Sequence, residues 1–201
     1  AADALKLDLA GGTMSGAIEF GQTSASGTSG SVEFDGVDDY LSVAGPGTLA
    51  ADSNWSMEAW VYPTGDSSST YRIMGANEST HGSEYIHMRV RNGGWEFFTQ
   101  NQSSGILGTV SFNEWAHVAF TKEGTTVRGF VNGVKVWEVV DANSDQISTL
   151  VVGYGYGSEY FKGYISNARF VNGSSVYTAD FTVPTESLEA VASTELLCCQ
   201  S

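Results

Sequence analysis

The chain has 201 residues, is 41% hydrophobic and carries 24 Gly, 10 Phe, 9 Tyr and 5 Trp, which excludes a disordered polymer and favours β-structure. Nine basic residues against 23 acidic ones leave a formal charge of −14. We therefore expect no nucleic acid and no anionic membrane as partners, because both are recognised through Lys and Arg. The same acidity favours solubility and divalent cations.

Residues 1–30 differ from the rest of the chain and are predicted to form an N-terminal arm with a linker. Apolar and polar residues alternate over residues 5–9, and a second short strand candidate covers residues 17–20. A run of Gly, Ser and Thr at 21–31 is typical of a flexible linker. The arm is too short to bury its own apolar face, so we expect it to pack on the main domain or on a partner chain.

From residue 32 onward, turn signals recur roughly every ten residues, which is the spacing of a β-sandwich or barrel. No long window shows helical periodicity, so the sequence predicts an all-β fold. The strand candidates are 32–35, 39–43, 55–62, 71–76, 84–91, 94–99, 106–111, 115–122, 125–132, 134–140, 148–153 and 161–171.

Two tight turns are predicted from Asn-Gly pairs between strand candidates. The clearest hairpin covers residues 129–137, where Asn132 and Gly133 tolerate the positive φ angles of a type I′ turn. Asn92 and Gly93 form a second pair of the same kind. These turns predict that the strands on either side of them are antiparallel neighbours.

The two cysteines, Cys198 and Cys199, are adjacent at the end of an apolar run that starts at Leu196. Neighbouring cysteines seldom satisfy disulfide geometry, so we expect no structural bridge within the chain. Two thiols without a nearby His also make a poor zinc site. We expect a buried strand end in which Cys acts as a small hydrophobic residue.

Four stretches of the chain carry motifs in a recognisable order. They are SVEFDGVDDYLSV at 31–43, NWSMEAWVYP at 54–63, NEWAHVAFTKEGTTVRGFVNGVKVWEV at 113–139 and FKGYISNARFVNGSSVYTADFTVPTESL at 161–188. Together they resemble the laminin-G-like, concanavalin A-like jelly-roll family. The resemblance implies a two-sheet antiparallel β-sandwich at 31–192, preceded by the arm and followed by a C-terminal strand or tail at 193–201.

Two further segments resemble parts of bacteriophage virion proteins. GGTMSGAIEF at 11–20 is similar to a segment that recurs in tail-fibre proteins, and residues 176–200 are similar to the end of laminin-G-like domains in phage structural proteins. The resemblance implies a tail-fibre or capsid-decorating protein on the particle surface, serving assembly or host-surface adhesion. Its partners would be other virion proteins, a host-surface glycan and copies of itself, with a homotrimer favoured. The alternative is a carbohydrate-binding module of a bacterial surface or secreted protein, which would be extracellular.

Catalysis is tested first because glycoside hydrolases share this fold. Retaining enzymes need two carboxylates about 5 Å apart. Glu33 and Asp35 share a strand face, but Gly36 breaks the strand directly after them, and Glu58 stands alone on its strand. We therefore expect no catalytic residues and no enzymatic activity.

Aromatic residues in loops are the candidates for ligand contact. Tyr154, Tyr156 and Tyr160 lie in the Gly-rich loop 152–161, which prevents their deep burial, and Trp95 follows a predicted turn. Loops on rigid sandwiches commonly carry recognition, and Tyr is a frequent contact residue. We predict these four residues to be ligand-binding, although the tyrosines could equally pack against a neighbouring subunit.

Other aromatic residues and histidines are interpreted as structural. Trp60, Trp115 and Trp137 sit inside strand candidates. His117 alternates with Trp115, so we expect it in or beside the core with its hydrogen bond satisfied. His81 lies in a polar loop, and nothing places the three histidines together, which makes a zinc site improbable.

Asp35, Asp38 and Asp39 crowd around Gly36 and are the candidate metal ligands. Family members bind one calcium ion at the rim through such side chains, and carboxylate oxygens suit calcium. The alternative is an ordinary Asp-rich turn whose carboxylates cap their own backbone amides. We expect no required cofactor, with a single calcium ion at this turn as the open alternative.

Overall fold

The computed structural model describes residues 30–76 and 86–200, and all regular structure in these ranges is β-strand, as predicted. None of these residues forms a helix that is long and apolar enough to cross a membrane. Residues 1–29 of the predicted arm and linker, and His81, lie outside the described residues. The strands are β1 (Val32–Asp35), β2 (Leu41–Leu49), β3 (Trp55–Pro63), β4 (Thr70–Ala76), β5 (Ile86–Arg91), β6 (Gly94–Thr99), β7 (Ala116–Glu123), β8 (Thr126–Val131), β9 (Val134–Val140), β10 (Asp145–Val152), β11 (Lys162–Asn172) and β12 (Thr194–Cys198).

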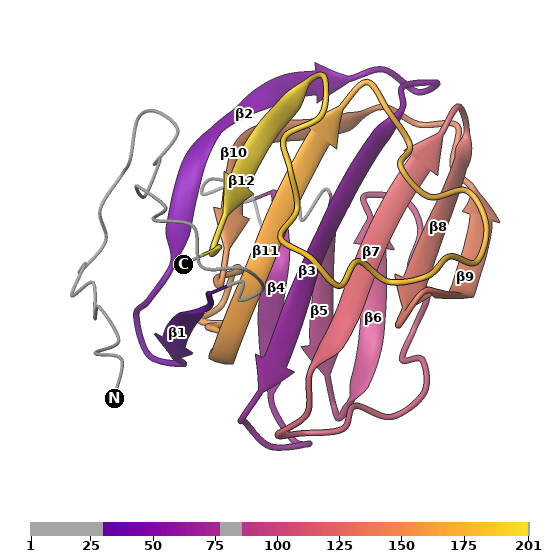
Figure 1. Cartoon of the computed structure of the whole chain (residues 1–201). Helices are drawn as coiled ribbons and strands as arrows, with labels where there is room; N and C mark the ends of the chain where they lie inside the picture. The colour runs from indigo at the N-terminus through magenta and orange to yellow at the C-terminus, as the bar shows by residue number, and fades with distance from the viewer. Residues whose placement is uncertain (1–29, 77–85, 201) are drawn as a thin grey trace.

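The strands form two antiparallel sheets packed face to face, which confirms the predicted sandwich (Figure 1). A seven-stranded sheet has the order β1-β11-β3-β7-β8-β9, and β12 pairs with β11 along the same edge as β1. A five-stranded sheet has the order β2-β10-β4-β5-β6. Because β12 belongs to the seven-stranded sheet, the end of the chain is part of the sandwich.

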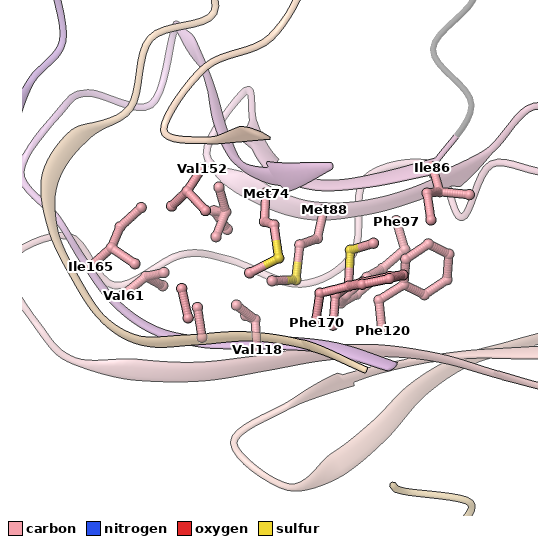
Figure 2. Close-up of a cluster of buried hydrophobic side chains, with 14 of the residues drawn as sticks. Val61, Met74, Ile86, Met88, Phe97, Val118, Phe120, Val152, Ile165 and Phe170 are labelled. Carbon is pink, nitrogen blue, oxygen red and sulfur yellow. The ribbon is translucent and has the colours of Figure 1, made fainter. Parts of the chain in front are cut away.

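The hydrophobic core lies between the two layers, where side chains of both inner faces interdigitate (Figure 2). Met74 and Met88 of the five-stranded sheet point toward Val118 and Phe170 of the other sheet, and all four are buried. The flexible thioethers fill irregular space between branched and aromatic side chains.

β3 is buried on both faces, which is unusual for an antiparallel sheet because such sheets commonly leave one face wet. Met57 and Ala59 face the core, while Ser56 and Glu58 face outward, yet all four are buried. The outer face must therefore be covered by another part of the chain.

The cover is residues 173–192, which we call the C-terminal strap (Figure 1). It leaves the end of β11, crosses the outer face of the seven-stranded sheet to the β8–β9 turn, and returns to β12. Its hydrogen bonds to the sheet run from Gly173 N to Asn54 O, Thr121 Oγ1 to Tyr177 O, Phe181 N to Gly133 O, Trp60 Nε1 to Pro184 O, and Arg169 Nη1 to Glu189 O.

Glu58 holds the centre of this layer with a side chain that is 1% exposed. Its carboxylate accepts hydrogen bonds from Arg169 Nε at 2.9 Å, from the Tyr177 hydroxyl at 2.8 Å and from His117 Nε2 at 3.1 Å. Burial alone would raise the pKa of Glu58, but the hydrogen bond with His117 and the charge of Arg169 lower it below its usual value. The carboxylate therefore stays ionised and joins three strands to the strap.

Most strand predictions are confirmed within a few residues, but the candidate at 106–111 is wrong. Gly105 and Gly108 have φ angles of 63° and 57°, and such left-handed residues interrupt an extended run. Leu107 instead makes an isolated bridge with Trp95 of β6, so this segment covers the edge of the five-stranded sheet.

The two Asn-Gly turns have the predicted geometry. Asn92 and Gly93 have φ angles of 49° and 74°, and Asn132 and Gly133 have φ angles of 49° and 77°. Positive φ at both central positions identifies type I′ turns, and each turn joins antiparallel neighbours as expected. Gly133 is also required by the strap, because a Cβ at this position would lie 2.1 Å from the Phe181 carbonyl oxygen.

We predict that Glu58→Gln lowers the free energy of unfolding by about 3 kcal/mol, because it leaves the buried Arg169 charge without its carboxylate. Urea denaturation measures this change, and Glu186→Gln on the exposed part of the strap should change it by less than about 0.5 kcal/mol. Since the folded-state pKa is lowered, the stabilisation is present above the usual carboxyl pKa and is lost as the pH falls through the folded value. A difference between the wild type and Glu58→Gln that does not shrink on acidification would contradict this account.

Candidate functional site

The loop 153–161, which we call the rim loop, joins β10 to β11 at one end of the sandwich. Gly153 N donates to Ile73 O of β4 at 2.9 Å, and Phe161 N donates to Gly153 O at 2.8 Å, so the start of the loop is tied to the five-stranded sheet and its two ends are tied to each other. Gly153 has a φ of 86°, and a Cβ there would lie 2.4 Å from the Phe34 ring. The position where the loop leaves β10 is therefore fixed by hydrogen bonds and by packing against Phe34.

An ionic network fastens the rim loop to the outer face of the five-stranded sheet. Glu159 binds Arg72 of β4 at 2.7 Å and Arg89 of β5 at 2.8 Å. Arg89 also binds Glu96 of β6 at 2.8 Å, so a chain of alternating charges crosses three neighbouring strands. Gly155 lies against this network, because a Cβ there would be 2.6 Å from Arg72 Nε. Such buried charge-assisted bonds fix the loop in one geometry.

Tyr154 and Tyr160 of this loop meet Tyr40, which directly precedes β2, and we call the three residues the rim tyrosine cluster. The rings of Tyr40 and Tyr154 are 5.4 Å apart, and those of Tyr154 and Tyr160 are 4.7 Å apart. All three are half-buried, and Tyr156 projects from the same loop with 56% of its surface exposed. The structure thus presents neighbouring aromatic rings that are held in place and open to solvent.

The predicted metal ligands lie beside these rings, in what we call the acidic turn (Asp35, Asp38 and Asp39). One carboxylate oxygen from each residue lies within 4.8 Å of those of the other two. Asp35 Oδ1 accepts from Val37 N at 2.7 Å and Asp39 Oδ2 accepts from Asp35 N at 3.0 Å, so the capping alternative also describes this turn. Three clustered carboxylates are a donor set that suits a hard divalent cation such as calcium.

The acidic turn and the rim tyrosine cluster form one site, which we call the rim site. Tyr40 directly follows Asp39 in the chain. Burial raises the pKa of Tyr160, and the neighbouring Tyr154 and Tyr40 and the charge of Asp38 also raise it. The acidic turn is therefore close enough to the rim tyrosine cluster to interact with it. Sequence reasoning treated the loop and the turn as separate candidates, and the fold brings them together.

Two expectations about aromatic residues are corrected by the structure. Trp95 is 6% exposed and belongs to the hydrophobic core, so its ring cannot stack on a ligand that arrives from solvent. Trp115, expected to be structural, precedes β7 and is 44% exposed beside Tyr62 on the seven-stranded sheet. Tyr40 was missed, and its position directly after the acidic turn was the only local signal for it.

Asp145 has the raised pKa of a glycosidase general acid, but not the accessibility that a glycosidase site requires. Such a site needs a general acid with a raised pKa that a substrate can reach. Burial raises the pKa of the Asp145 carboxyl to about 6. Asp145 binds Lys122 at 3.3 Å, and both side chains are inaccessible to solvent. The expected lack of enzymatic activity stays a prediction.

Residues 35–180 match the Laminin_G_3 family model, whose description is the concanavalin A-like lectin/glucanases superfamily. Comparison with curated proteins gives no match. The matched range contains the acidic turn, the rim loop and both Asn-Gly turns.

Solved structures with the same architecture come from distant proteins. A putative carbohydrate binding protein from Bacteroides ovatus is 16% identical with a TM-score of 0.64, over 86% of this chain and 52% of that chain. A native heptameric SAP-like pentraxin from Limulus polyphemus is 15% identical with a TM-score of 0.55, over 74% of this chain and 78% of that chain. Domains LG4-5 of the mouse laminin alpha1 chain are 14% identical with a TM-score of 0.54, over 77% of this chain and 45% of that chain. These likenesses show the shared fold alone, and this chain spans about half the length of the Bacteroides and laminin chains.

We predict that Glu159→Gln loosens the rim loop, because it removes the charge that binds Arg72 and Arg89. Amide hydrogen exchange across residues 153–161 should become about tenfold faster or more, which hydrogen-exchange mass spectrometry measures. The control is Glu138→Gln, which removes an exposed carboxylate bound to Arg128 and should leave exchange in the rim loop unchanged. Equal exchange in the wild type and Glu159→Gln would show that the ionic network does not hold the loop.

Proposed function

The chain belongs to the concanavalin A-like lectin/glucanases superfamily, and from this premise we propose that it is a carbohydrate-binding module. The observation that carries the proposal is the rim tyrosine cluster, whose half-buried rings lie close together, two of them on the loop that Glu159 fastens. Aromatic faces with a polar hydroxyl at the edge suit sugars, which present C–H groups on one face and hydroxyl groups around it.

The proposed ligand is a neutral glycan. The chain has a formal charge of −14, and the acidic turn adds three carboxylates directly beside the rim tyrosine cluster. A sialylated or uronic acid-containing glycan would be repelled by these charges, whereas a neutral sugar would not. Because the rim loop is fixed before binding, little conformational entropy is lost when the ligand stacks on it.

A calcium ion at the acidic turn is the second part of the proposal. Asp35, Asp38 and Asp39 would hold it through their carboxylate oxygens, which are the ligands that calcium prefers. The ion would neutralise the mutual repulsion of these groups and stiffen the turn that carries Tyr40. Its role is therefore to support the aromatic cluster, and no chemistry on the glycan is assigned to it.

The setting of this module on a phage particle stays a prediction from the sequence. It rests on the resemblance of residues 11–20, which lie outside the described residues, and of residues 176–200 to virion proteins. A glycan-binding sandwich on a tail fibre or capsid surface would serve host-surface adhesion, so both interpretations share the rim site. We accordingly propose an extracellular or particle-surface location, with the predicted homotrimer and virion partners belonging to the phage interpretation.

We predict that the full chain binds a neutral oligosaccharide and that Tyr154→Ala weakens this binding about tenfold or more, because the central ring of the cluster is lost. A glycan array identifies the ligand, and isothermal titration calorimetry measures the affinity. Trp115→Ala is the matched control, since it removes an exposed aromatic ring that packs beside Tyr62 and is not part of the rim tyrosine cluster. Equal loss in both variants, or no binding by the wild type to any neutral glycan, would refute the rim site.

We predict that calcium raises the melting temperature of chelator-treated protein and that Asp38→Asn abolishes this rise. Asp38 is the informative position because Asp35 and Asp39 also accept hydrogen bonds from backbone amides of the turn. Asp66→Asn is the control, since Asp66 caps a different exposed turn through Ser68. An equal calcium response in Asp38→Asn and Asp66→Asn would place the ion elsewhere, and no response in the wild type would leave the acidic turn as a capping motif.

A further inference from the structure

The two cysteines at the end of β12 are brought together by an unusual backbone conformation. In a regular strand, consecutive side chains point to opposite faces, which would separate Cys198 from Cys199. Cys199 instead has a φ of 62°, in the left-handed region that residues with a Cβ rarely adopt. The chain turns at this residue, and the two Sγ atoms lie 3.5 Å apart.

This conformation is held by the neighbouring strand β11. Asn167 N donates to the Cys199 carbonyl oxygen at 2.9 Å. The Asn167 side-chain oxygen accepts from Leu188 N at 2.8 Å and from Gln200 Nε2 at 3.0 Å. The turn after β12 and the end of the C-terminal strap therefore meet at one asparagine, and the strained residue between them is fixed on both sides.

We propose that Cys198 and Cys199 form a reversible redox pair, a dithiol that a hydroperoxide oxidises to a disulfide between adjacent residues. The two sulfur atoms must approach by roughly 1.5 Å to reach a disulfide bond length of about 2.05 Å. The left-handed conformation of Cys199 brings the two sulfur atoms this close before any oxidation.

The two cysteines have different roles in the reaction. Cys198 is half-buried and Cys199 is buried, so the peroxide reaches Cys198 first. The hydrogen bond with Cys198, together with burial, raises the pKa of the Cys199 thiol well above its usual value, which keeps Cys199 protonated during this first step. Cys198 is therefore the attacking thiol and Cys199 the resolving thiol.

Each step balances. The Cys198 thiolate attacks one peroxide oxygen, the O–O bond breaks, and Cys198 becomes a sulfenic acid while hydroxide leaves and takes a proton to give water. The Cys199 sulfur then attacks the Cys198 sulfur, the S–O bond breaks and a second water leaves. In total, the two thiols lose two protons and two electrons, and hydrogen peroxide takes up both to give two waters.

The resulting bond is easily reversed. A single peptide link fixes the two Cα atoms about 3.8 Å apart, below the range of about 4.4–6.8 Å in ordinary disulfides. Such strain raises the reduction potential and makes the bond labile. The geometry that excludes a permanent structural bridge at this position therefore suits a switch.

The test uses the full chain, first reduced and then treated with hydrogen peroxide. Intact mass spectrometry should show the loss of two hydrogens in a species that stays monomeric on a non-reducing gel, and mild dithiothreitol should restore the original mass. Peptide mapping should place the change on Cys198 and Cys199. An unchanged mass, oxygen addition alone, or cross-linked chains would each overturn the proposal.

Cys199→Ser provides the matched control because it removes only the resolving thiol. In this variant, oxidation should stop at the Cys198 sulfenic acid, which dimedone captures, whereas the wild type should capture far less dimedone. Equal dimedone capture in the two proteins would show that Cys199 does not resolve the sulfenic acid. The mass and gel measurements on the wild type decide the question even where the variant does not fold.

Discussion

The buried carboxylate of Glu58 is the interaction on which the outer layer of the molecule depends. An ionised group that is 1% exposed is stable only with charged and hydrogen-bonding partners around it, and here they come from β7, β11 and the C-terminal strap. Because Tyr177 brings one of these bonds, the strap is locked to the sheet by the same charge that β3 must bury. At the centre of the seven-stranded sheet, the core therefore covers the inner face and the C-terminal strap covers the outer face.

The five-stranded sheet uses the same solution for a different purpose. There the carboxylate of Glu159 belongs to the covering loop and the arginines, Arg72 and Arg89, belong to the sheet. The ion pairs hold a loop whose tyrosines face solvent. The buried charges therefore fix the positions of the exposed rings. In each layer a segment without regular structure is made rigid by a carboxylate shared between separate chain elements.

The predictable and unpredictable parts of this structure differ in how far apart the contacting residues lie in the chain. Strands and Asn-Gly turns follow from local patterns, and the glycines of the rim loop correctly marked Tyr154 as accessible. Trp95 was misjudged because a position after a turn does not reveal which face of the strand is covered. Glu58 was taken as isolated on its strand, since its partners Arg169 and Tyr177 are 111 and 119 positions away. Tyr40 could not be identified for the same reason, because its ring partner Tyr154 is also far away in the chain.

The long separation between Glu58 and its partners also determines when, during protein synthesis, the contacts of Glu58 can form. β3 leaves the ribosome with a carboxylate whose arginine and tyrosine are still to be made, so the outer face around Glu58 stays hydrated. That face is sealed only when Tyr177 emerges, and contacts of such high sequence separation form slowly. Because β11 supplies both Arg169 and the core residue Phe170, the core and the outer face of the sandwich can close only after β11 has been made.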